Sequence, residues 1–545
     1  MAGRWSHRTC SDSSCTIPAR RAIIETRSVI FLASENGALP GGKVGGVGDV
    51  LRDLPTALAV NGWDVTVATP SYGSLHRLPE AKILTSIDVD FRGEIHTVGL
   101  WQVPSGSYGV HNLVFEHRLF AEHGTGQIYV RDDDHRPFAS DADRFAFFCA
   151  AAAQYVFAGE RLPDVVHLHD WHASLYILLT HFANRYRHLK DIRTVFTVHN
   201  LSYQGIRPLA GDASSLESWF PELNYDYDAI VDPRYDDCVN PMAAAIRLAD
   251  CVSTVSPTYA EEICRASDRS RGFVGGEGLE ADLQDARDQG RLAGVLNGCD
   301  YDESGTARPG WQHLRNLMRS QVEAWLQREP GSEAHKLALQ RLEQLPNRRP
   351  HHVLTSVGRL VAQKAALLLY GIDDDTSALQ RIAEHVSPNG VVLLLGSGDP
   401  FLEQRLLQQA HDIPNLVFLN GYSETLADPL YDSGDLFLMP SSFEPCGISQ
   451  MLAMRAGQPC VVHGVGGLRD TVDDGVSGFV FDGDDPHAQA GDFVQTTLNA
   501  IQMRSSDPIR WHDICRNAAT RRFDWESCAR QTIEKLYGEK HESKE

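Results

Sequence analysis

Several short polar motifs in this sequence contain residue types that could bind an anion. The first, Lys43-Val44-Gly45-Gly46-Val47-Gly48-Asp49, places a lysine and glycines at the start of a predicted helix. Glycines let the backbone approach a ligand closely, and N–H groups at a helix N-terminus attract negative charge. Lys43, Gly45, Gly46 and Asp49 are therefore candidate ligands of a phosphate or nucleoside. A plain tight turn is the alternative for a glycine-rich loop taken alone.

A pair of positive side chains forms the second motif. Arg359 and Lys364 lie in a loop after a predicted strand, so both can converge on one anion. The pair is significant because the chain has a formal net charge of −22 and an anionic substrate needs a local positive site. Two solvated surface charges are the alternative on spacing alone.

A carboxylate occupies a third loop, which is bounded by proline and glycine. Glu444 lies between Pro440 and Gly447, just before another predicted helix. This position suits a carboxylate that holds sugar hydroxyls within a cleft, and the helix start favours phosphate. A second glycine-rich helix start follows at Gly466 and Gly467.

Histidines end two further predicted strands. One strand leads into His167, His169, Asp170 and His172, and the next ends at His199. Three histidines and a carboxylate permit a metal site, but one histidine lies past a turn and no second ligand cluster accompanies them. The favoured interpretation is a metal-free polar rim of a sugar pocket, with Asp170 facing it. A structural role is the alternative for His199.

Apolar runs of strand length precede these motifs and alternate with helical periodicity. This pattern predicts an α/β protein with two Rossmann-like domains and a cleft between them, where ligands bind at the carboxyl ends of the strands. The predicted strands are 28–33, 64–68, 164–168, 193–198, 251–255, 352–357, 391–395, 416–419, 436–439 and 459–462.

The expected organisation has five parts. Residues 1–27 form a disordered N-terminal extension, and residues 28–300 form the N-terminal Rossmann-like domain. Residues 301–350 lack strands and form a helical connection. Residues 351–505 form the C-terminal Rossmann-like domain, and residues 506–545 form C-terminal helices.

The composition argues against several classes of protein. The strongly acidic charge disfavours nucleic acid and anionic lipid as partners. No apolar run reaches the length of a membrane span. The 11 cysteines include no CxxC pair, which favours a reducing compartment and a cytoplasmic location.

Taken together, the motifs resemble those of the ADP-glucose-type glycogen and starch synthases, which have the GT-B fold. The resemblance covers about residues 28–300 and 352–484, and its ten motifs follow the family's order. They are KVGGVGDV, HLHDWH, FTVHNLSYQG, TVSPTYAEEI, GVLNGCD, GRLVAQK, LLGSGDP, NGYSE, PSSFEPCGISQ and VGGLRDTV.

The resemblance implies roles for the catalytic candidates. Glu444 resembles the family's essential carboxylate, which binds glucose hydroxyls and steadies positive charge at the anomeric carbon. Arg359 and Lys364 resemble the pair that neutralises the departing diphosphate. His199 resembles the residue that contacts the transferred glucosyl group, and Asp170 resembles a cleft residue beside it.

The resemblance also suggests which residues bind the substrates. The glycine-rich loop resembles the one that faces the donor diphosphate, and Tyr422 resembles the ring that stacks on adenine. No metal or cofactor is expected. The predicted substrate-binding residues are Lys43, Gly45, Gly46, Asp49, Asn297, Tyr422, Gly447, Gly466 and Gly467.

The resulting hypothesis is a synthase that transfers glucose from ADP-glucose to the non-reducing end of an α-1,4-glucan such as glycogen, with retention. A GT-B transferase using another acceptor or UDP-glucose is one alternative, because residues 85–140 depart from the family pattern. Ser442 also replaces a common arginine, and Ala365 a usual glycine. A non-catalytic glucan-binding or regulatory protein is the other alternative.

Overall fold

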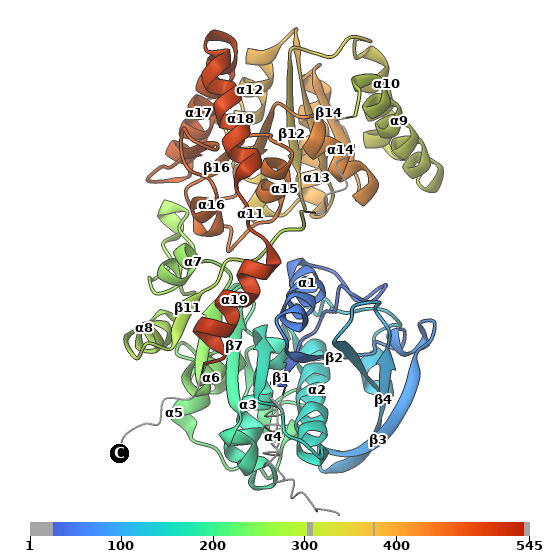
Figure 1. Cartoon of the computed structure of the whole chain (residues 1–545), viewed down its shortest axis with the longest axis vertical. Helices are drawn as coiled ribbons and strands as arrows, with labels where there is room; N and C mark the ends of the chain where they lie inside the picture. The colour runs from blue at the N-terminus through green and yellow to red at the C-terminus, as the bar shows by residue number, and fades with distance from the viewer. Residues whose placement is uncertain (1–25, 134, 302–308, 374–375, 539–545) are drawn as a thin grey trace, which may run out of the picture.

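The computed structural model describes residues 26–133, 135–301, 309–373 and 376–538. These residues form two α/β domains, one above the other in Figure 1, with the chain crossing between them twice. The predicted N-terminal extension lies outside the described residues, apart from Thr26 and Arg27.

The N-terminal domain is built on a mixed sheet. Within the described residues it has nine strands in the order β11-β10-β7-β6-β1-β2-β5-β4-β3. Neighbours from β11 to β5 are parallel, whereas β4 is antiparallel to both β3 and β5. The strands are β1 (Ser28–Leu32), β2 (Asp64–Pro70), β3 (Lys82–Phe91), β4 (Glu94–Val103), β5 (Val110–Glu116), β6 (Val165–His169), β7 (Arg193–Val198), β10 (Cys251–Thr254) and β11 (Leu292–Gly294).

Helices cover both faces of this sheet, which is why its central strands read as continuous apolar runs. In β1, Val29 and Phe31 face one core, whereas Ile30 and Leu32 face the other. The remaining elements of this part of the chain are α1 (Gly46–Val60), α2 (Ala139–Ala158), α3 (Asp170–Phe182), α4 (Leu216–Trp219), α5 (Tyr227–Ile230), α6 (Pro241–Leu248), α7 (Pro257–Glu262), α8 (Glu280–Asp288) and a small antiparallel pair, β8 (Arg207–Pro208) and β9 (Cys238–Val239).

The C-terminal domain has a six-stranded parallel sheet within the described residues, in the order β14-β13-β12-β15-β16-β17. Its strands are β12 (His352–Val357), β13 (Gly390–Gly396), β14 (Leu416–Asn420), β15 (Leu436–Met439), β16 (Cys460–His463) and β17 (Phe479–Phe481). Its helices are α11 (Ala362–Ala365), α12 (Ala378–Val386), α13 (Pro400–Asp412), α14 (Glu424–Ser433), α15 (Ser449–Arg455), α16 (Gly466–Thr471), α17 (Pro486–Ser506) and α18 (Pro508–Thr520).

Helices α9 (Trp311–Arg328) and α10 (Glu333–Gln344) occupy most of the segment predicted as a helical connection. Leu314, Met318 and Val322 of α9 share a core with Val353 and Val391 of the C-terminal sheet. These helices therefore form part of the C-terminal domain's own packing, as Figure 1 shows.

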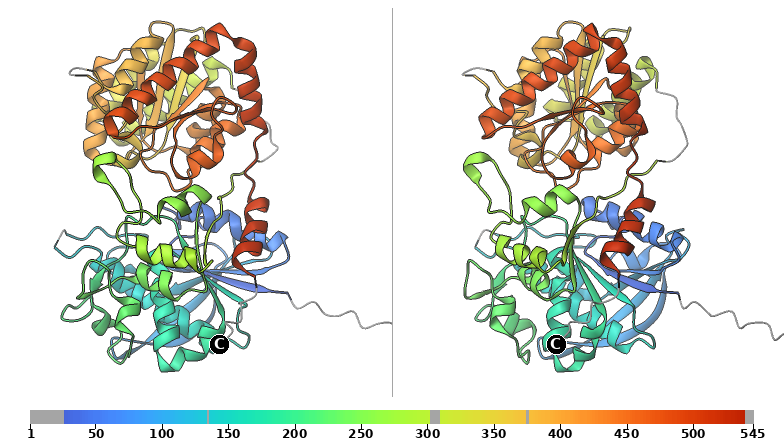
Figure 2. Two further views of the ribbon diagram at one scale, coloured as in Figure 1. Left: turned by 90° about the vertical axis from the view of Figure 1, so that its left-hand side faces the viewer. Right: turned by 60° about the vertical axis from the view of Figure 1, so that its left-hand side comes forward.

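The last helix, α19 (Trp525–Leu536), returns to the N-terminal domain. Figure 2 shows it leaving the upper domain and lying on the lower one. Cys528 and Ala529 join the same core as Leu51 and Leu54 of α1. The two chain crossings therefore tie the domains together at one side.

Candidate functional site

The loops that follow strands of the two sheets meet between the domains. The Ser256 hydroxyl, after β10, donates to the Pro445 carbonyl in the loop after β15. The Thr258 backbone N–H and hydroxyl donate to the two Asp470 carboxylate oxygens of α16, at 2.9 and 2.7 Å. Three of the sequence motifs, TVSPTYAEEI, PSSFEPCGISQ and VGGLRDTV, therefore meet between the domains.

Glu444 and Lys364 form an ion pair in this region. Lys364 Nζ lies 3.0 Å from Glu444 Oε2, to which the Ser441 hydroxyl also donates at 3.1 Å. Glu444 is 6% exposed, so its charge is largely removed from water. Arg359 lines a small pocket together with Lys364 and Ser441. The structure thus brings the two predicted positive residues and the predicted carboxylate together.

Adjacent strands explain this convergence. β12 ends at Val357 and β15 ends at Met439, and these two strands are neighbours in the parallel sheet. Their loops are joined further, because the Ser442 N–H and hydroxyl both donate to the Gln363 carbonyl at 2.8 and 3.1 Å. The serine that replaces a common family arginine therefore ties one loop to the other.

The glycines near Glu444 permit close packing of backbone. A Cβ on Gly466 would lie 2.0 Å from the Glu444 carbonyl oxygen, and one on Gly467 would lie 2.3 Å from the Cys446 carbonyl oxygen. Gly466 donates its N–H to Glu262 Oε1 at 3.0 Å. Gly447 has a φ of +74°, which favours glycine. The part of these glycines in substrate binding stays a prediction.

The histidines of β6 and the one directly after β7 are buried and hydrogen-bonded. His169 Nδ1 lies 2.8 Å from His199 Nε2. The two ring nitrogens of His167 are bonded to the Tyr537 hydroxyl at 2.8 Å and the Thr197 hydroxyl at 2.6 Å. Among the described residues, no group of histidines, cysteines and carboxylates is arranged to hold a metal ion.

Asp170 begins α3 directly after β6, and its carboxylate fixes the backbone just after the neighbouring strand β7. Its Oδ1 accepts from the His199 N–H at 2.7 Å. Burial raises the pKa of the Asp170 carboxyl to about 7. The residue has a φ of +53°, which is strained for a side chain other than glycine and often marks a functional site.

The glycine-rich loop is held by a carboxylate that the sequence reasoning missed. Glu35 Oε2 accepts from the N–H groups of Val44 at 2.7 Å and Gly45 at 2.8 Å. Lys43 pairs with Asp49 at 2.7 Å, so both predicted charged residues of this loop face each other. The position of Glu35, three residues after β1, was the signal that could have drawn attention to it.

Tyr422 and Asn297 border the same region from opposite domains. Tyr422 follows β14, is 70% exposed and donates its hydroxyl to Glu424 at 2.6 Å. Partial burial, the Glu424 carboxylate and then the Asp49 charge raise the pKa of Tyr422 to about 12. Asp49 belongs to α1, so Tyr422 faces the N-terminal domain. The Asn297 backbone interacts with Cys446, two residues after Glu444.

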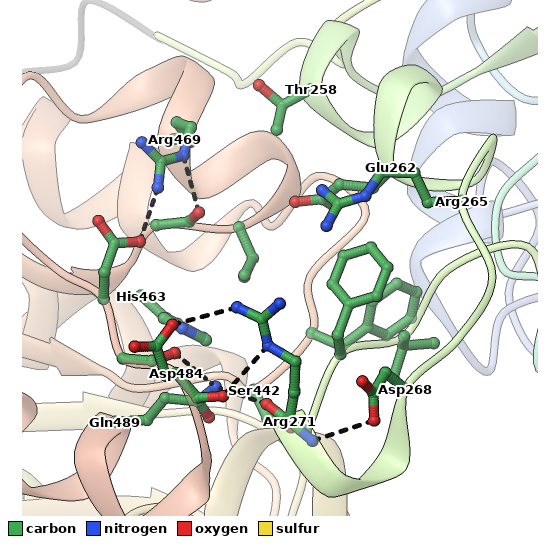
Figure 3. Close-up of a pocket in the computed structure, with 18 of the residues that line it drawn as sticks. Thr258, Glu262, Arg265, Asp268, Arg271, Ser442, His463, Arg469, Asp484 and Gln489 are labelled. Atoms are coloured by element: carbon green, nitrogen blue, oxygen red, sulfur yellow. Dashed lines mark hydrogen bonds and ion pairs between the residues drawn. The ribbon is translucent and has the colours of Figure 1, made fainter.

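A larger interdomain pocket, of about 540 Å³, lies between α7 and the ends of β16 and β17. Figure 3 shows arginines from both domains pointing into it. Arg271 pairs with Asp484 at 3.1 Å across the domains, and Arg469 pairs with Asp482 at 2.6 Å. Burial raises the pKa of Glu262, which also lines the pocket, to about 7. None of the residues predicted to bind substrate lines this pocket.

Comparisons with known proteins identify the family. Residues 28–285 match the family model "Starch synthase catalytic domain", and residues 344–499 match "Glycosyl transferases group 1". A glycogen synthase from Anaeromyxobacter sp. (strain Fw109-5) is 36% identical over 528 residues, covering 93% of this chain and 98% of that protein. This chain belongs to the glycogen and starch synthase family.

Other members of the family agree along nearly the whole chain. The glycogen synthase of Streptococcus sanguinis (strain SK36) is 31% identical and covers 94% of this chain and 99% of its own. The solved catalytic domain of starch synthase IV from Arabidopsis thaliana, bound to ADP and acarbose, superposes with a TM-score of 0.71 at 27% identity. It covers 94% of this chain and 98% of its own.

The family and the GT-B fold predicted from the motifs are therefore confirmed, and the chain is a glycosyltransferase with glycogen or starch synthase function. In the described part of the chain, no helix has the length and apolar character needed to cross a membrane. The comparisons leave the roles of individual site residues as predictions.

Proposed function

We propose that this synthase transfers glucose from ADP-glucose to the non-reducing end of an α-1,4-glucan, with retention of the anomeric configuration. The carrying observation is the buried Glu444 carboxylate, which lies 3.0 Å from Nζ of Lys364. Lys364 and Arg359 line the same small pocket. In an acidic protein, this arrangement supplies local positive charge beside a carboxylate held out of water.

This arrangement fits the charges that glucosyl transfer creates. As the glycosidic bond to the nucleotide breaks, negative charge develops on the diphosphate and positive charge on the sugar. Arg359 and Lys364 would stabilise the leaving diphosphate, and Glu444 would stabilise the sugar. His199 and Asp170 would border the transferred glucose, with Asn297 on the same side. Charge stabilisation by fixed groups is typically the largest catalytic contribution.

The remaining predicted ligands would bind the donor around this centre. The loop containing Gly45 and Gly46 lies at the start of α1, where helix N–H groups favour a diphosphate. In the structure Lys43 is paired with Asp49, so it would have to exchange this partner to contact the donor. The Gly447 backbone, three residues after Glu444, would also approach the donor. Gly466 and Gly467 pack closely against the backbone of the loop that contains Glu444.

Two observations support adenine as the base of the donor nucleotide. Tyr422 presents an exposed ring that faces α1, and a purine overlaps such a ring more than uracil does. Stacking contributes only about 1–3 kcal/mol per base and cannot by itself secure strong discrimination. The similar starch synthase IV domain is described as bound to ADP and acarbose. We therefore assign ADP-glucose as donor and an α-glucan as acceptor.

We also place the enzyme in the cytoplasm. The cysteines within the described residues are all free thiols, and most of them are buried. Such cysteines suit a reducing compartment.

The decisive experiment measures transfer of radiolabelled glucose from ADP-glucose and from UDP-glucose to glycogen, maltose and maltotriose in parallel. We expect a clearly higher kcat/KM with ADP-glucose and glycogen. Equal kcat/KM for the two donors, or a preference for UDP-glucose, would overturn the donor assignment. Transfer to a different acceptor class, with none to glucans, would overturn the acceptor assignment.

A further inference from the structure

A hydrogen bond joins two histidines at the ends of neighbouring strands. His169 is the last residue of β6, and His199 follows β7 by one residue. His169 Nδ1 and His199 Nε2 are 2.8 Å apart. His169 is 1% exposed and His199 is 8% exposed, so neither ring is freely solvated.

Both rings are neutral at neutral pH. Burial lowers the pKa of His199 to about 4 and holds the pKa of His169 well below its ordinary value, with nearby His167 and His199 adding to the second effect. A hydrogen bond between neutral imidazoles needs a proton on one of the two facing nitrogens and a lone pair on the other. The bond therefore couples the two tautomers, because a proton on His169 Nδ1 requires the His199 proton on Nδ1, whereas a proton on His199 Nε2 requires the His169 proton on Nε2.

The far nitrogen of His169 decides between the two arrangements. His169 Nε2 is buried and has no hydrogen-bond partner among the described residues. If His199 Nε2–H donated, the His169 proton would sit on this nitrogen as a buried N–H without an acceptor. If His169 Nδ1–H donates, Nε2 carries only a lone pair. Orphaned buried N–H groups are rarer than under-satisfied acceptors, so the second arrangement is favoured.

The His169 ring is also held in place by its neighbours. It stacks on His167 with ring centroids 4.4 Å apart and on Phe31 at 5.3 Å. His167 is itself fixed at both ring nitrogens, by Tyr537 and Thr197. Rotation of the His169 ring would disturb this stack, so the ring keeps Nδ1 toward His199.

We propose that His169 is a positioning residue that holds His199 in the tautomer with its proton on Nδ1. Among the described residues, the ring of His199 is bonded only through Nε2. His199 therefore offers an N–H donor, rather than a lone pair, to an oxygen atom of the bound sugar. The backbone of His199 is fixed separately by Asp170, so its ring and main chain have independent supports. The identity of the ligand as a sugar rests on the proposed function.

The tautomer can be measured without any activity. Nitrogen-15 chemical shifts of histidine rings distinguish a protonated nitrogen from an unprotonated one. We expect His199 in the ligand-free wild-type protein, assigned by the signals lost in His199→Gln, to carry its proton on Nδ1. A proton on Nε2 would overturn the proposal, whatever reaction the enzyme catalyses. Failure of transfer from ADP-glucose with a proton on Nδ1 would instead overturn only the proposed function.

Variants of His169 test the consequence for turnover. His169→Leu removes the donor and should lower kcat about tenfold or more, with a smaller change in the KM for donor and in ADP affinity. His169→Asn keeps an amide donor near the Nδ1 position and should recover much of this loss. Wild-type kcat in His169→Leu, or no recovery in a folded His169→Asn, would contradict the positioning role.

A matched control exists in the C-terminal domain, at the edge of its sheet where the strands begin. His351 Nδ1 and His352 Nε2 also form a 2.8 Å histidine–histidine hydrogen bond, at the start of β12. His352→Leu removes this bond far from the strand ends that form the site, so kcat should stay at the wild-type value. If His169→Leu fails to fold, the wild-type spectrum and the His169→Asn kinetics still decide the matter.

Discussion

At the scale of single residues, the ion pair between Glu444 and Lys364 is the main electrostatic feature of the site. Removing two charges from water costs several kcal/mol per ion unless each finds good partners. Glu444 has Lys364 and Ser441 as partners, and both contacts are to the same carboxylate oxygen, Oε2. Such a group is better explained by the reaction than by stability.

Replacing Glu444 should therefore affect turnover more than folding. Glu444→Gln keeps the side-chain volume and an acceptor for Ser441 but removes the negative charge. We expect kcat and kcat/KM to fall together by about 100-fold or more, because a transition-state interaction is lost. ADP affinity should be retained, as measured by calorimetry.

An exposed glutamate provides the control for this variant. Glu526 pairs with Arg530 at 2.6 Å on the surface of α19, and both side chains are more than half exposed. Glu526→Gln should change stability by less than about 1 kcal/mol and leave kcat unchanged. Turnover near the wild-type value in Glu444→Gln would show that Glu444 is structural.

At the scale of elements, the sequence indicated the strands that hold the site with little error. The predicted runs 193–198, 352–357 and 436–439 coincide with β7, β12 and β15. These strands are buried on both faces, so apolar runs define them clearly. In contrast, β3 is mostly exposed and pairs antiparallel at the sheet edge, so its sequence shows no comparable run.

Packing between distant elements was less accessible to sequence reasoning. The helical character of the C-terminal segment was expected, but not the position of α19 on the N-terminal sheet. The decisive contact joins Tyr537 to His167, 370 residues apart, and no local pattern encodes such a pairing. Glu35 is a different case, because its partners Val44 and Gly45 lie in the same loop between β1 and α1, and its position after β1 was a local signal.

Tyr537 should stabilise the N-terminal domain through its hydroxyl as well as its ring. The side chain is fully buried, packs against Trp63 and donates or accepts one hydrogen bond with His167. Tyr537→Phe keeps the ring but leaves a buried histidine nitrogen unpaired, which should cost about 1–3 kcal/mol. Thermal unfolding followed by calorimetry should show a Tm lowered by several degrees.

The comparison for this variant is a tyrosine that makes no such contact. Tyr108 is 98% exposed, so Tyr108→Phe should leave Tm within about one degree of the wild type, as is usual for surface substitutions. Equal Tm values for Tyr537→Phe and Tyr108→Phe would mean that the hydroxyl contributes nothing to stability.

At the scale of the whole molecule, the domains meet through polar contacts as well as through the two chain crossings. Ser256 bonds to the loop after β15, whereas Thr258 and Glu262 bond to residues of α16. Interfaces of this polar kind are typical of domains that move relative to one another. The charge state of a buried group between the domains should therefore influence how tightly the two domains associate.

Glu262 is the buried interdomain group whose protonation changes near neutral pH. Its pKa is raised from 4.5 to about 7, chiefly by burial, while the Gly466 N–H and the Arg469 and Arg265 charges partly oppose the rise and Asp470 adds to it. A carboxyl whose folded pKa is raised binds its proton more tightly in the folded state. Its stabilising contribution is therefore present below about pH 4.5 and is lost as pH rises through 7.

Glu262→Gln should remove this dependence, because the amide keeps an acceptor for Gly466 and cannot ionise. We expect wild type and variant to have similar Tm values near pH 5, and the wild type to fall progressively below the variant toward pH 8. Asp170 titrates in the same direction but is present in both proteins, so the difference isolates Glu262. Asp484→Asn, which removes a highly exposed partner of Arg271, should leave the pH dependence as in the wild type. Parallel Tm curves for wild type and Glu262→Gln across this range would show that the carboxyl titrates alike in the folded and unfolded chains, and that the interdomain contact does not depend on its proton.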